Sequence, residues 1–306
     1  MMNKQPVIFF GNEQIAHGVK NIVTPTLEGL IGAGYEVVAV FTSPDFVVKK
    51  KLVEPRVKIV AKQHGIEVFQ PTNMKDLTEL VKGIFTRVDK KPIGILESYG
   101  YMIPSSILEM FEPWGVVNIH PSLLPKYRGA TPVEAPILNG DGETGVSLMK
   151  LVKKMDAGPV YAQKAVELRG NETKQELYER LAKLGAEMLV ETLPSIVSGE
   201  LIAIEQDEAK ATYCQKLDKS MTWLEVRSTG AQEAYNRVRA FDGYPKSKIE
   251  ISGVSCVLNE VGVAGMRQTE ADLKCADGNY LVVKRLTPEG AKEMGVVDFM
   301  NGYLKR

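Results

Sequence analysis

Short apolar runs alternate with amphipathic stretches through the first two-thirds of the chain. The runs are rich in Val, Ile and Phe and have the length of strands, and the stretches between them have helical character. This alternation is typical of a parallel sheet covered by helices. It predicts strands at Val7 to Phe10, Glu36 to Thr42, Ile93 to Leu96, Val116 to His120 and Val146 to Leu151. It predicts helices at Thr26 to Ala33, Arg56 to His64, Met74 to Phe85 and Lys174 to Val197.

The pattern changes after residue 206. A polar and charged stretch at residues 205–219 is followed by a predicted helix from Ser228 to Phe241 and then by short β-rich pieces between Gly and Asp turns. The predicted strands are Lys248 to Ile251, Val254 to Val263, Leu273 to Ala276 and Tyr280 to Val283. Such spacing is typical of a small barrel. We therefore predict an α/β domain with a Rossmann-like layout at residues 1–206 and a small β-barrel domain at residues 207–306.

Composition supports two ordinary globular domains. The chain has 306 residues, 44% of them hydrophobic and 25% charged, with a formal net charge of zero, so contact with a nucleic acid has to be local. No stretch approaches the roughly 20 apolar residues of a membrane span, and the first apolar run is too short for a signal peptide. Three cysteines without zinc-site spacing predict reduced thiols and no metal. We expect a cytoplasmic monomer.

Asn118 and His120 close one of the predicted strands, where their side chains share a face and can converge on one reacting atom. Sites in open α/β sheets lie beyond the carboxyl ends of the strands. An amide N–H can donate to an oxyanion, an imidazole can move a proton, and a downstream carboxylate, Asp156, can orient the imidazole. Because no Ser or Cys stands in a nucleophile-elbow pattern, the set favours direct attack of an amine in acyl transfer. The alternative is a structural histidine at a strand end.

The segment Gly11 to Gly18 after the first predicted strand lacks the G-x-G-x-x-G order. A dinucleotide cofactor is therefore not expected, although the predicted layout is Rossmann-like.

The stretch around His120 resembles the folate-dependent formyltransferase family. Asn118-x-His120 runs into Ser122-Leu123-Leu124-Pro125 and Arg128-Gly129, with Asp156-Ala157-Gly158 downstream, in the order and spacing of that family. The resemblance covers nearly the whole chain. Further matching pieces are Phe41-Thr42-Ser43-Pro44-Asp45, Tyr99-Gly100 with Ile103-Pro104, Gly142-Glu143-Thr144-Gly145-Val146, Arg239-Ala240-Phe241, Thr287-Pro288-Glu289-Gly290 and Asp298-Phe299-Met300-Asn301-Gly302.

The resemblance implies that 10-formyltetrahydrofolate gives its formyl group to the α-amino group of methionine on initiator tRNA. Asn118 would donate to the formyl oxygen as that atom becomes an oxyanion. His120 would supply a second donor or manage the proton. Asp156 would pair with His120 and favour its charged form, or accept the proton of the amine through a water molecule. The residues leave open which of these two groups is the immediate base.

Contacts to both substrates are also implied by the resemblance. The turn and wall residues that would border the folate are Ser122, Leu123, Leu124, Pro125, Tyr99, Gly100, Met102 and Ile103. The backbone groups of the turn are expected to be free for the polar edges of the pterin, the alternative being a plain tight turn.

Basic residues are the candidates for the acceptor side. Those that would meet the tRNA acceptor stem are Lys49, Lys50, Lys51 and Arg56, with Lys58 beside them. The alternative is an ordinary solvated face. In the C-terminal domain, the resemblance implies an open oligonucleotide-binding barrel that contacts the tRNA. Arg128 would hold the loop of Asp156 or a substrate phosphate.

The chain departs from the family pattern in four places. Gly11-Asn12-Glu13-Gln14-Ile15 replaces a Gly-Thr-Pro-x-Phe run, and Phe46-Val47-Val48-Lys49-Lys50-Lys51 lacks the family's glycine and arginine stretch. Glu97 stands at a position that is usually apolar, where burial would raise its pKa unless it is paired. Val152-Lys153-Lys154 resembles the sugar-nucleotide formyltransferases.

Three alternatives remain at this point. The first is a formyltransferase with the same donor and an amino-sugar nucleotide as acceptor, which the carboxy-terminal motif disfavours. The second is a tRNA-binding homologue without turnover, which the intact Asn118, His120 and Asp156 disfavour. The third is hydrolysis of the formyl-folate, with water in place of the amine.

Overall fold

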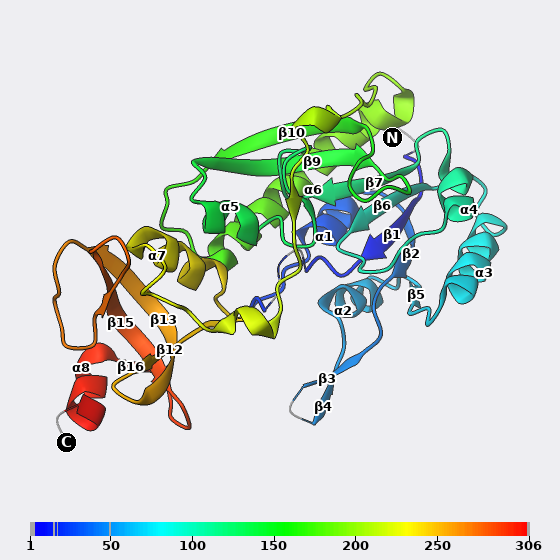
Figure 1. Cartoon of the computed structure of the whole chain (residues 1–306). Helices are drawn as coiled ribbons and strands as arrows, with labels where there is room; N and C mark the ends of the chain where they lie inside the picture. The colour runs from blue at the N-terminus through cyan, green and yellow to red at the C-terminus, as the bar shows by residue number, and fades with distance from the viewer. Residues whose placement is uncertain (1–3, 15, 17, 49, 305–306) are drawn as a thin grey trace.

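Two sheets at opposite ends of the molecule organise the chain (Figure 1). The computed structural model describes residues 4–14, 16, 18–48 and 50–304. The larger sheet has seven strands, in the spatial order β10 (Val160–Glu167), β9 (Glu143–Lys150), β7 (Val116–His120), β6 (Ile93–Glu97), β1 (Val7–Gly11), β2 (Val37–Phe41) and β5 (Val68–Phe69). The strands from β7 to β5 run parallel. The predicted α/β domain with a parallel sheet is therefore confirmed for these strands.

The β9 and β10 strands make the sheet mixed at one edge. β9 pairs antiparallel with β7, and β10 pairs antiparallel with β9. Antiparallel neighbours need no crossover helix, so residues 151–159 alone connect them. This connection carries Asp156, which we call the Asp156 segment.

Helices cover both faces of the larger sheet (Figure 1). Phe9 points toward one face, whereas Ile8 and Phe10 belong to the core on the other, and all three are fully buried. Burial on both sides explains the unbroken apolar run. The helices on the first face are α1 (Pro25–Gly32), α2 (Arg56–Gln63) and α6 (Lys174–Ser198), and those on the second are α3 (Met74–Phe85) and α4 (Ser105–Leu108).

Local signals explain where the long helix α6 begins and ends. The Thr173 hydroxyl accepts the backbone N–H of Glu176, and the Glu176 carboxylate accepts the backbone N–H of Thr173. This capping box satisfies two donors that the first turn of a helix leaves free. Gly199 closes the helix at φ +79°, a left-handed conformation that glycine adopts without strain.

The second sheet is antiparallel and has a core of its own. Its pairing path runs β12 (Ser247–Ile251), β13 (Val254–Ala264), β15 (Tyr280–Pro288) and β14 (Leu273–Lys274), with β16 (Met294–Gly295) on β15. The helices α7 (Ala231–Ala240) and α8 (Val296–Phe299) pack on it, and the turn Met300–Leu304 follows. The predicted helix and strands of this half are confirmed, although β15 continues to Pro288.

The remaining elements are short. They are the hairpin strands β3 (Phe46–Val48) and β4 (Lys51–Val53), the paired strands β8 (Arg128–Gly129) and β11 (Tyr213–Cys214), α5 (Glu134–Asn139), and single turns at Glu109–Phe111, Glu208–Lys210 and Lys219–Thr222. None of the helices within the described ranges is long and apolar enough to cross a membrane.

Buried polar contacts join the two halves near the end of α7. Arg239 donates to the carbonyl of Glu172 at 2.7 Å, and Lys174 donates to the carbonyl of Tyr244 at 2.9 Å. Burial lowers the pKa of Lys174. Phe241 packs into the core of the larger sheet. The motif Arg239-Ala240-Phe241 therefore lies at a packed joint, while the boundary at residues 206 and 207 stays a prediction.

Candidate active site

Asn118 and His120 lie on β7 as the sequence predicts. Both side chains are on one face of the strand, and each residue is only 5% exposed. Asn118 is paired in register with Leu96 of β6, so its side chain lies on the face of α3 and α4. Within the described part of the chain, the Asn118 carboxamide has no hydrogen-bond partner. Its N–H groups are therefore available to a substrate.

Asp156 comes to His120 from the Asp156 segment. Its Oδ1 lies 3.8 Å from His120 Nδ1, and its Oδ2 accepts the backbone N–H of Gly129 at 2.8 Å. The backbone of Asp156 has φ +49°, a left-handed conformation that a residue with a side chain rarely adopts. The structure thus brings the three predicted polar groups, Asn118, His120 and Asp156, to one end of β7.

The histidine ring has one nitrogen engaged and one that faces the carboxylate. His120 Nε2 lies 2.9 Å from the carbonyl oxygen of Tyr127. Because a carbonyl can only accept, Nε2 has to carry the hydrogen, and a neutral ring then holds its lone pair on Nδ1. The 3.8 Å to Asp156 is too long for a hydrogen bond. Proton uptake at Nδ1 would create a cation beside this carboxylate.

Several backbone N–H and carbonyl groups of the turn after β7 are already hydrogen-bonded within the protein. Ser147 donates to the carbonyl of Ser122 and accepts the N–H of Leu124, and Gln163 donates to the carbonyl of Leu124. The carbonyl of Pro125 accepts the N–H of Thr212. The expectation that the backbone of the turn is free for a pterin is therefore wrong for these groups, because β9, β10 and the later chain satisfy them. Contact of Ser122, Leu123, Leu124 and Pro125 with a folate stays a prediction.

The loop after β6 forms a partly apolar wall beside β7. Tyr99 and Ile103 are buried, Gly100 has φ +79°, and Met102 is 71% exposed. The Tyr99 ring meets the Phe10 ring edge-on. Its hydroxyl has no hydrogen-bond partner among the described residues, and burial raises its pKa.

Arg128 is completely buried and is bonded within the protein. Its guanidinium donates to Gln206 at 2.8 and 3.1 Å, to Glu208 at 2.9 Å and to the hydroxyl of Tyr213 at 3.2 Å. Gln206 in turn donates to the backbone of Asp156. Of the two predicted roles for Arg128, this geometry favours holding the Asp156 segment over contact with a substrate phosphate.

Gly129 and Gly158 are needed for close approach. A Cβ on Gly158 would stand 1.8 Å from the carbonyl oxygen of Lys150, and one on Gly129, at φ +117°, would stand 2.5 Å from the carbonyl oxygen of Cys214. Real Cβ atoms do not come so near. At both positions a side chain would have no room, so each glycine is required for the close approach of the backbone.

Of the five predicted basic residues, the four that the structure describes lie on or near the hairpin of β3 and β4, which projects from the carboxyl end of β2 (Figure 1). Lys50, Lys51 and Arg56 are exposed, and Lys49 lies outside the described residues. Lys58 is different, because its ammonium binds Asp45 at 2.7 Å and Glu54 at 3.0 Å and closes the base of the hairpin. The expectation that Lys58 is free for phosphate is therefore wrong.

Two of the four departures from the family pattern meet in space. Glu13 and Glu97 are both fully buried near the start of α1. The backbone N–H groups of Thr26 and Leu27 donate to Glu13 at 2.8 and 2.9 Å, whereas neither carboxyl oxygen of Glu97 makes a hydrogen bond of normal length to the described residues. Burial raises the pKa of Glu97 to about 7, although the nearby Thr26 hydroxyl lowers it. Burial and the charge of Glu97 also raise the pKa of Glu13.

Sequence reasoning missed two polar side chains near the site. Asn12 donates to the carbonyls of Ser98 and Tyr99 and accepts from Thr42 and Ser43, so it ties together the loops after β1, β2 and β6. The position of Asn12 directly after the first strand was the only available signal. Gln206 gave no signal, since it stands in a polar stretch far along the chain.

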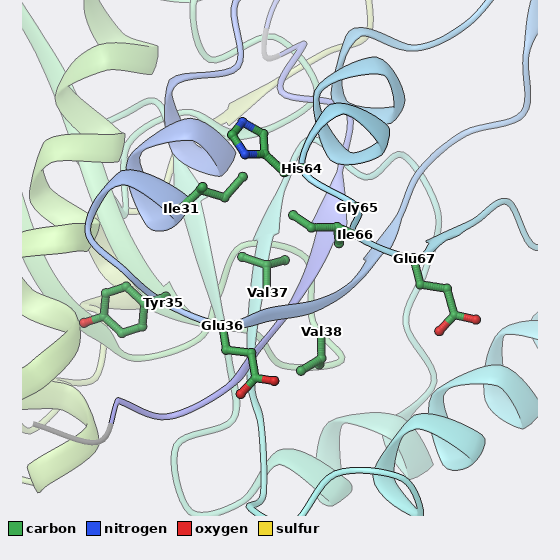
Figure 2. A pocket seen from close by; sticks show the side chains of 9 residues that line it. All are labelled: Ile31, Tyr35, Glu36, Val37, Val38, His64, Gly65, Ile66 and Glu67. Atoms are coloured by element: carbon green, nitrogen blue, oxygen red, sulfur yellow. The ribbon is translucent and has the colours of Figure 1, made fainter. Parts of the chain in front are cut away.

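A surface hollow of about 390 Å³ lies at the other edge of the sheet, beside the amino ends of β2 and β5 (Figure 2). Its lining residues are Ile31, Tyr35, Glu36, Val37, Val38, His64, Gly65, Ile66 and Glu67. The hollow contains no residue of the candidate site. The polar groups that converge at the carboxyl end of β7 are therefore the better candidate for chemistry.

Family models match both halves of the chain. A model described as formyl transferase matches residues 7–193, and a model described as formyl transferase, C-terminal domain, matches residues 216–304. The chain is 34% identical to a methionyl-tRNA formyltransferase from Lactobacillus acidophilus, over 97% of this chain and 95% of the relative. It is 36% identical to one from Lactobacillus delbrueckii subsp. bulgaricus, over 98% and 96%. A relative of the same name from Methylococcus capsulatus is 34% identical, over 94% and 95%.

Solved structures share the fold. An N-formyltransferase from Helicobacter canadensis in complex with folinic acid and dTDP-3-aminofucose has a TM-score of 0.67 at 19% identity, over 92% of this chain and 99% of that one. HypX from Aquifex aeolicus in complex with tetrahydrofolic acid has a TM-score of 0.61 at 17% identity, over 87% of this chain and 47% of HypX. This chain thus spans about half the length of HypX. The matched models and the relatives that align with almost the full length show that the chain belongs to the formyl transferase family.

Proposed function

We propose that this chain transfers the formyl group of 10-formyltetrahydrofolate to the α-amino group of methionine on initiator tRNA. The observation that carries the proposal is the similarity over almost the full length to relatives named methionyl-tRNA formyltransferase, at 34% and 36% identity. This similarity includes the C-terminal domain. The amino-sugar N-formyltransferase is 19% identical and supports the fold alone.

The side chains at β7 suit direct attack by an amine. The nitrogen of methionine bonds to the formyl carbon, and the carbonyl oxygen becomes an oxyanion. The unpartnered carboxamide of Asn118 donates to that oxyanion, a contact that typically contributes about 10²–10³ in rate. The bond between the formyl carbon and N10 of the folate then breaks, and N10 takes up one proton.

In this proposal His120 is the immediate proton acceptor. The bond from Nε2 to the carbonyl of Tyr127 leaves Nδ1 of the neutral ring without a proton. Nδ1 takes the proton of the amine, and Asp156, 3.8 Å away, stabilises the cation that results. The same proton is then available to the leaving N10, so the reaction needs no other acid.

The two substrates reach the site from different sides in this proposal. The turn Ser122 to Pro125 and the loop residues Tyr99, Gly100, Met102 and Ile103 border the folate. The exposed cations Lys50, Lys51 and Arg56 meet phosphates of the tRNA. We assign the enzyme to the cytoplasm as part of this proposal, and its state as a monomer stays a prediction.

The test is an acceptor panel. Purified protein is incubated with 10-formyltetrahydrofolate and methionyl initiator tRNA, with uncharged tRNA, with an amino-sugar nucleotide or with the donor alone. We expect a formylated product on the charged tRNA only. Product on the sugar alone would leave the formyl chemistry in place and replace the acceptor. If 10-formyltetrahydrofolate were consumed at the same rate in all four incubations, including the one without acceptor, the activity would be hydrolysis.

A further inference from the structure

Gln206 connects the Asp156 segment to a buried arginine. Its Nε2 donates to the carbonyl of Asp156 at 2.8 Å and to that of Gly158 at 2.7 Å. Its Oε1 accepts from Arg128 at 2.8 and 3.1 Å. Each polar atom of the amide is engaged twice, and the guanidinium fixes its orientation because an arginine can only donate.

The Asp156 segment needs such support. Asp156 has φ +49°, a left-handed backbone conformation that is unfavourable for a residue with a side chain. The two bonds from Gln206 hold the backbone carbonyls of Asp156 itself and of Gly158, two residues later. The bond from the N–H of Gly129 to Oδ2 holds the carboxylate and leaves Oδ1 toward His120.

The chain around Gln206 is itself anchored to the active-site turn. β11 pairs with β8, and Thr212 exchanges backbone bonds with Pro125 and Arg128. The hydroxyl of Thr212 accepts the N–H of Tyr127 at 2.9 Å, and the carbonyl of Tyr127 orients His120. One stretch of chain, residues 206–214, therefore supports the partners of both His120 and Asp156.

Two ion pairs, both to Glu208, strengthen the same connection. Glu208 accepts from Arg128 at 2.9 Å and from Lys154 at 2.6 Å. The bonds from Arg128 and Lys154 lower the pKa of Glu208 to about 2. Lys154 belongs to the Asp156 segment and to Val152-Lys153-Lys154, one of the departures from the family pattern. The ion pair with Glu208 therefore gives this departure a structural partner.

We propose that Gln206 is a positioning residue for formyl transfer, which holds the Asp156 carboxylate at His120 through the backbone of the Asp156 segment. The proposal rests on the function proposed above. Gln206 touches no reacting atom in it. Loss of its two donor bonds should misplace Asp156 and slow the chemical step while both substrates still bind.

Two variants separate this role from a general loss of stability. Gln206→Glu keeps an acceptor for Arg128 but replaces the donor NH₂ group with an oxygen, which cannot donate to the carbonyls of Asp156 and Gly158. Gln206→Met keeps the length of the side chain and removes its polar atoms without adding charge. Asp207→Asn is the matched control, because Asp207 is the next residue and caps a surface turn through an oxygen that Asn retains. Among the described residues its side chain is bonded to Ala209 and Lys210 and not to the Asp156 segment.

The experiment measures steady-state formylation of methionyl initiator tRNA together with backbone amide exchange by mass spectrometry over residues 127–131 and 154–159. In both Gln206 variants we expect kcat to fall by about 10- to 100-fold with both KM values near wild type. We also expect faster exchange in the two peptides and a melting temperature that stays well above the assay temperature, although the lost bonds lower it. The control should match wild type in all readouts.

Several results would overturn the proposal. Wild-type exchange in both variants would show that Gln206 does not hold the segment, and a wild-type kcat with faster exchange would show that holding it is irrelevant to chemistry. A rise in KM alone would indicate substrate contact instead of positioning. If the wild-type chain formylates no tRNA, the proposed function fails, and the exchange data still decide whether Gln206 holds the segment.

Discussion

The Asp156 segment and the hairpin of β3 and β4 are both connections between neighbouring strands or helices, yet they are held in opposite ways. The segment is hydrogen-bonded to Gln206, Gly129 and Glu208. At Gly158 its backbone packs so closely against Lys150 that a Cβ atom would not fit. The hairpin pairs with itself, is closed at its base by Lys58, and exposes 70% of Val47 and 69% of Leu52. In the proposed function this difference suits a segment that holds Asp156 at His120 and a hairpin that contacts the tRNA.

The largest effect should follow from removing a group of the site. We expect Asp156→Asn and His120→Ala each to lower kcat by about 10²–10⁴, because each removes part of the proton transfer. Tight binding of methionyl initiator tRNA should persist, since neither residue is part of the hairpin. Rapid-quench formylation and a filter-binding assay measure the two quantities. Rates like wild type in either variant would remove that residue from the chemistry.

Crowding the tightly held segment should have the next largest effect. Gly158→Ala places a Cβ where the carbonyl of Lys150 stands, at 1.8 Å, so the segment has to shift. We expect the free energy of unfolding to fall by about 1–3 kcal/mol and kcat to fall with it. Gly142→Ala is the matched control, because nothing lies within 4 Å of its Cβ position. Equal behaviour of the two variants in urea unfolding would contradict the close packing.

The buried carboxyl pair beside α1 should make stability depend on pH. The pKa of Glu97 is raised from 4.5 to about 7, so the folded state binds this proton more tightly than the unfolded state. The free energy of unfolding therefore falls as pH rises through that window, by at most about 1.4 kcal/mol per pH unit for one proton. Glu13 acts in the same direction.

Glu97→Gln should flatten this dependence, because an amide cannot ionise. Urea unfolding at several pH values between about 5 and 8 measures it. The variant should gain stability relative to wild type as pH rises. Parallel curves for the two proteins would show that Glu97 does not carry the extra proton.

A smaller effect is expected from the three consecutive lysines at residues 49–51. Lys49, Lys50 and Lys51 changed together to Ala should weaken tRNA binding and reduce the slope of log affinity against log salt by up to about 0.7–0.9 for each lost phosphate contact. The rate at saturating enzyme should stay near wild type. Lys82→Ala with Lys90→Ala, two exposed lysines before β6, is the control. An unchanged salt slope would remove the hairpin from the interface.

The smallest effect should come from the apolar side chains of the same hairpin. Val47→Ser with Leu52→Ser removes an exposed cross-strand pair, so the free energy of unfolding should change by no more than about 0.5 kcal/mol per site. Thermal unfolding measures it. A loss of several kcal/mol would show that the hairpin is packed in solution.

The sequence predicted β7 and α3 with their observed ends, because a buried run and a capped amphipathic helix carry strong local signals. It placed Asn118 and His120 correctly, since two residues on one strand face are also a local relation. The hairpin strands were missed because a run of lysines after Val48 indicated a loop. β10 was missed because it is an edge strand in which no residue is fully buried and apolar and polar residues do not alternate regularly.

Long-range polar contacts could not be predicted. The raised pKa expected of a buried, unpaired Glu97 is confirmed, but its closeness to Glu13, far away in the chain, could not be predicted. Gln206 makes all its bonds to residues distant in sequence. Only the folded backbone brings such groups together, so their roles follow from the structure and not from a pattern.

Single-turnover formylation of methionyl initiator tRNA from 10-formyltetrahydrofolate at saturating enzyme separates the chemical step from tRNA binding. Wild type, Asp156→Asn and the triple lysine variant are compared. We predict a fast reaction for wild type, the same rate for the lysine variant once the tRNA is bound, and a rate lower by at least about 10² for Asp156→Asn. A wild-type chain that forms no formyl-methionyl-tRNA, or an Asp156→Asn variant as fast as wild type, would contradict the account.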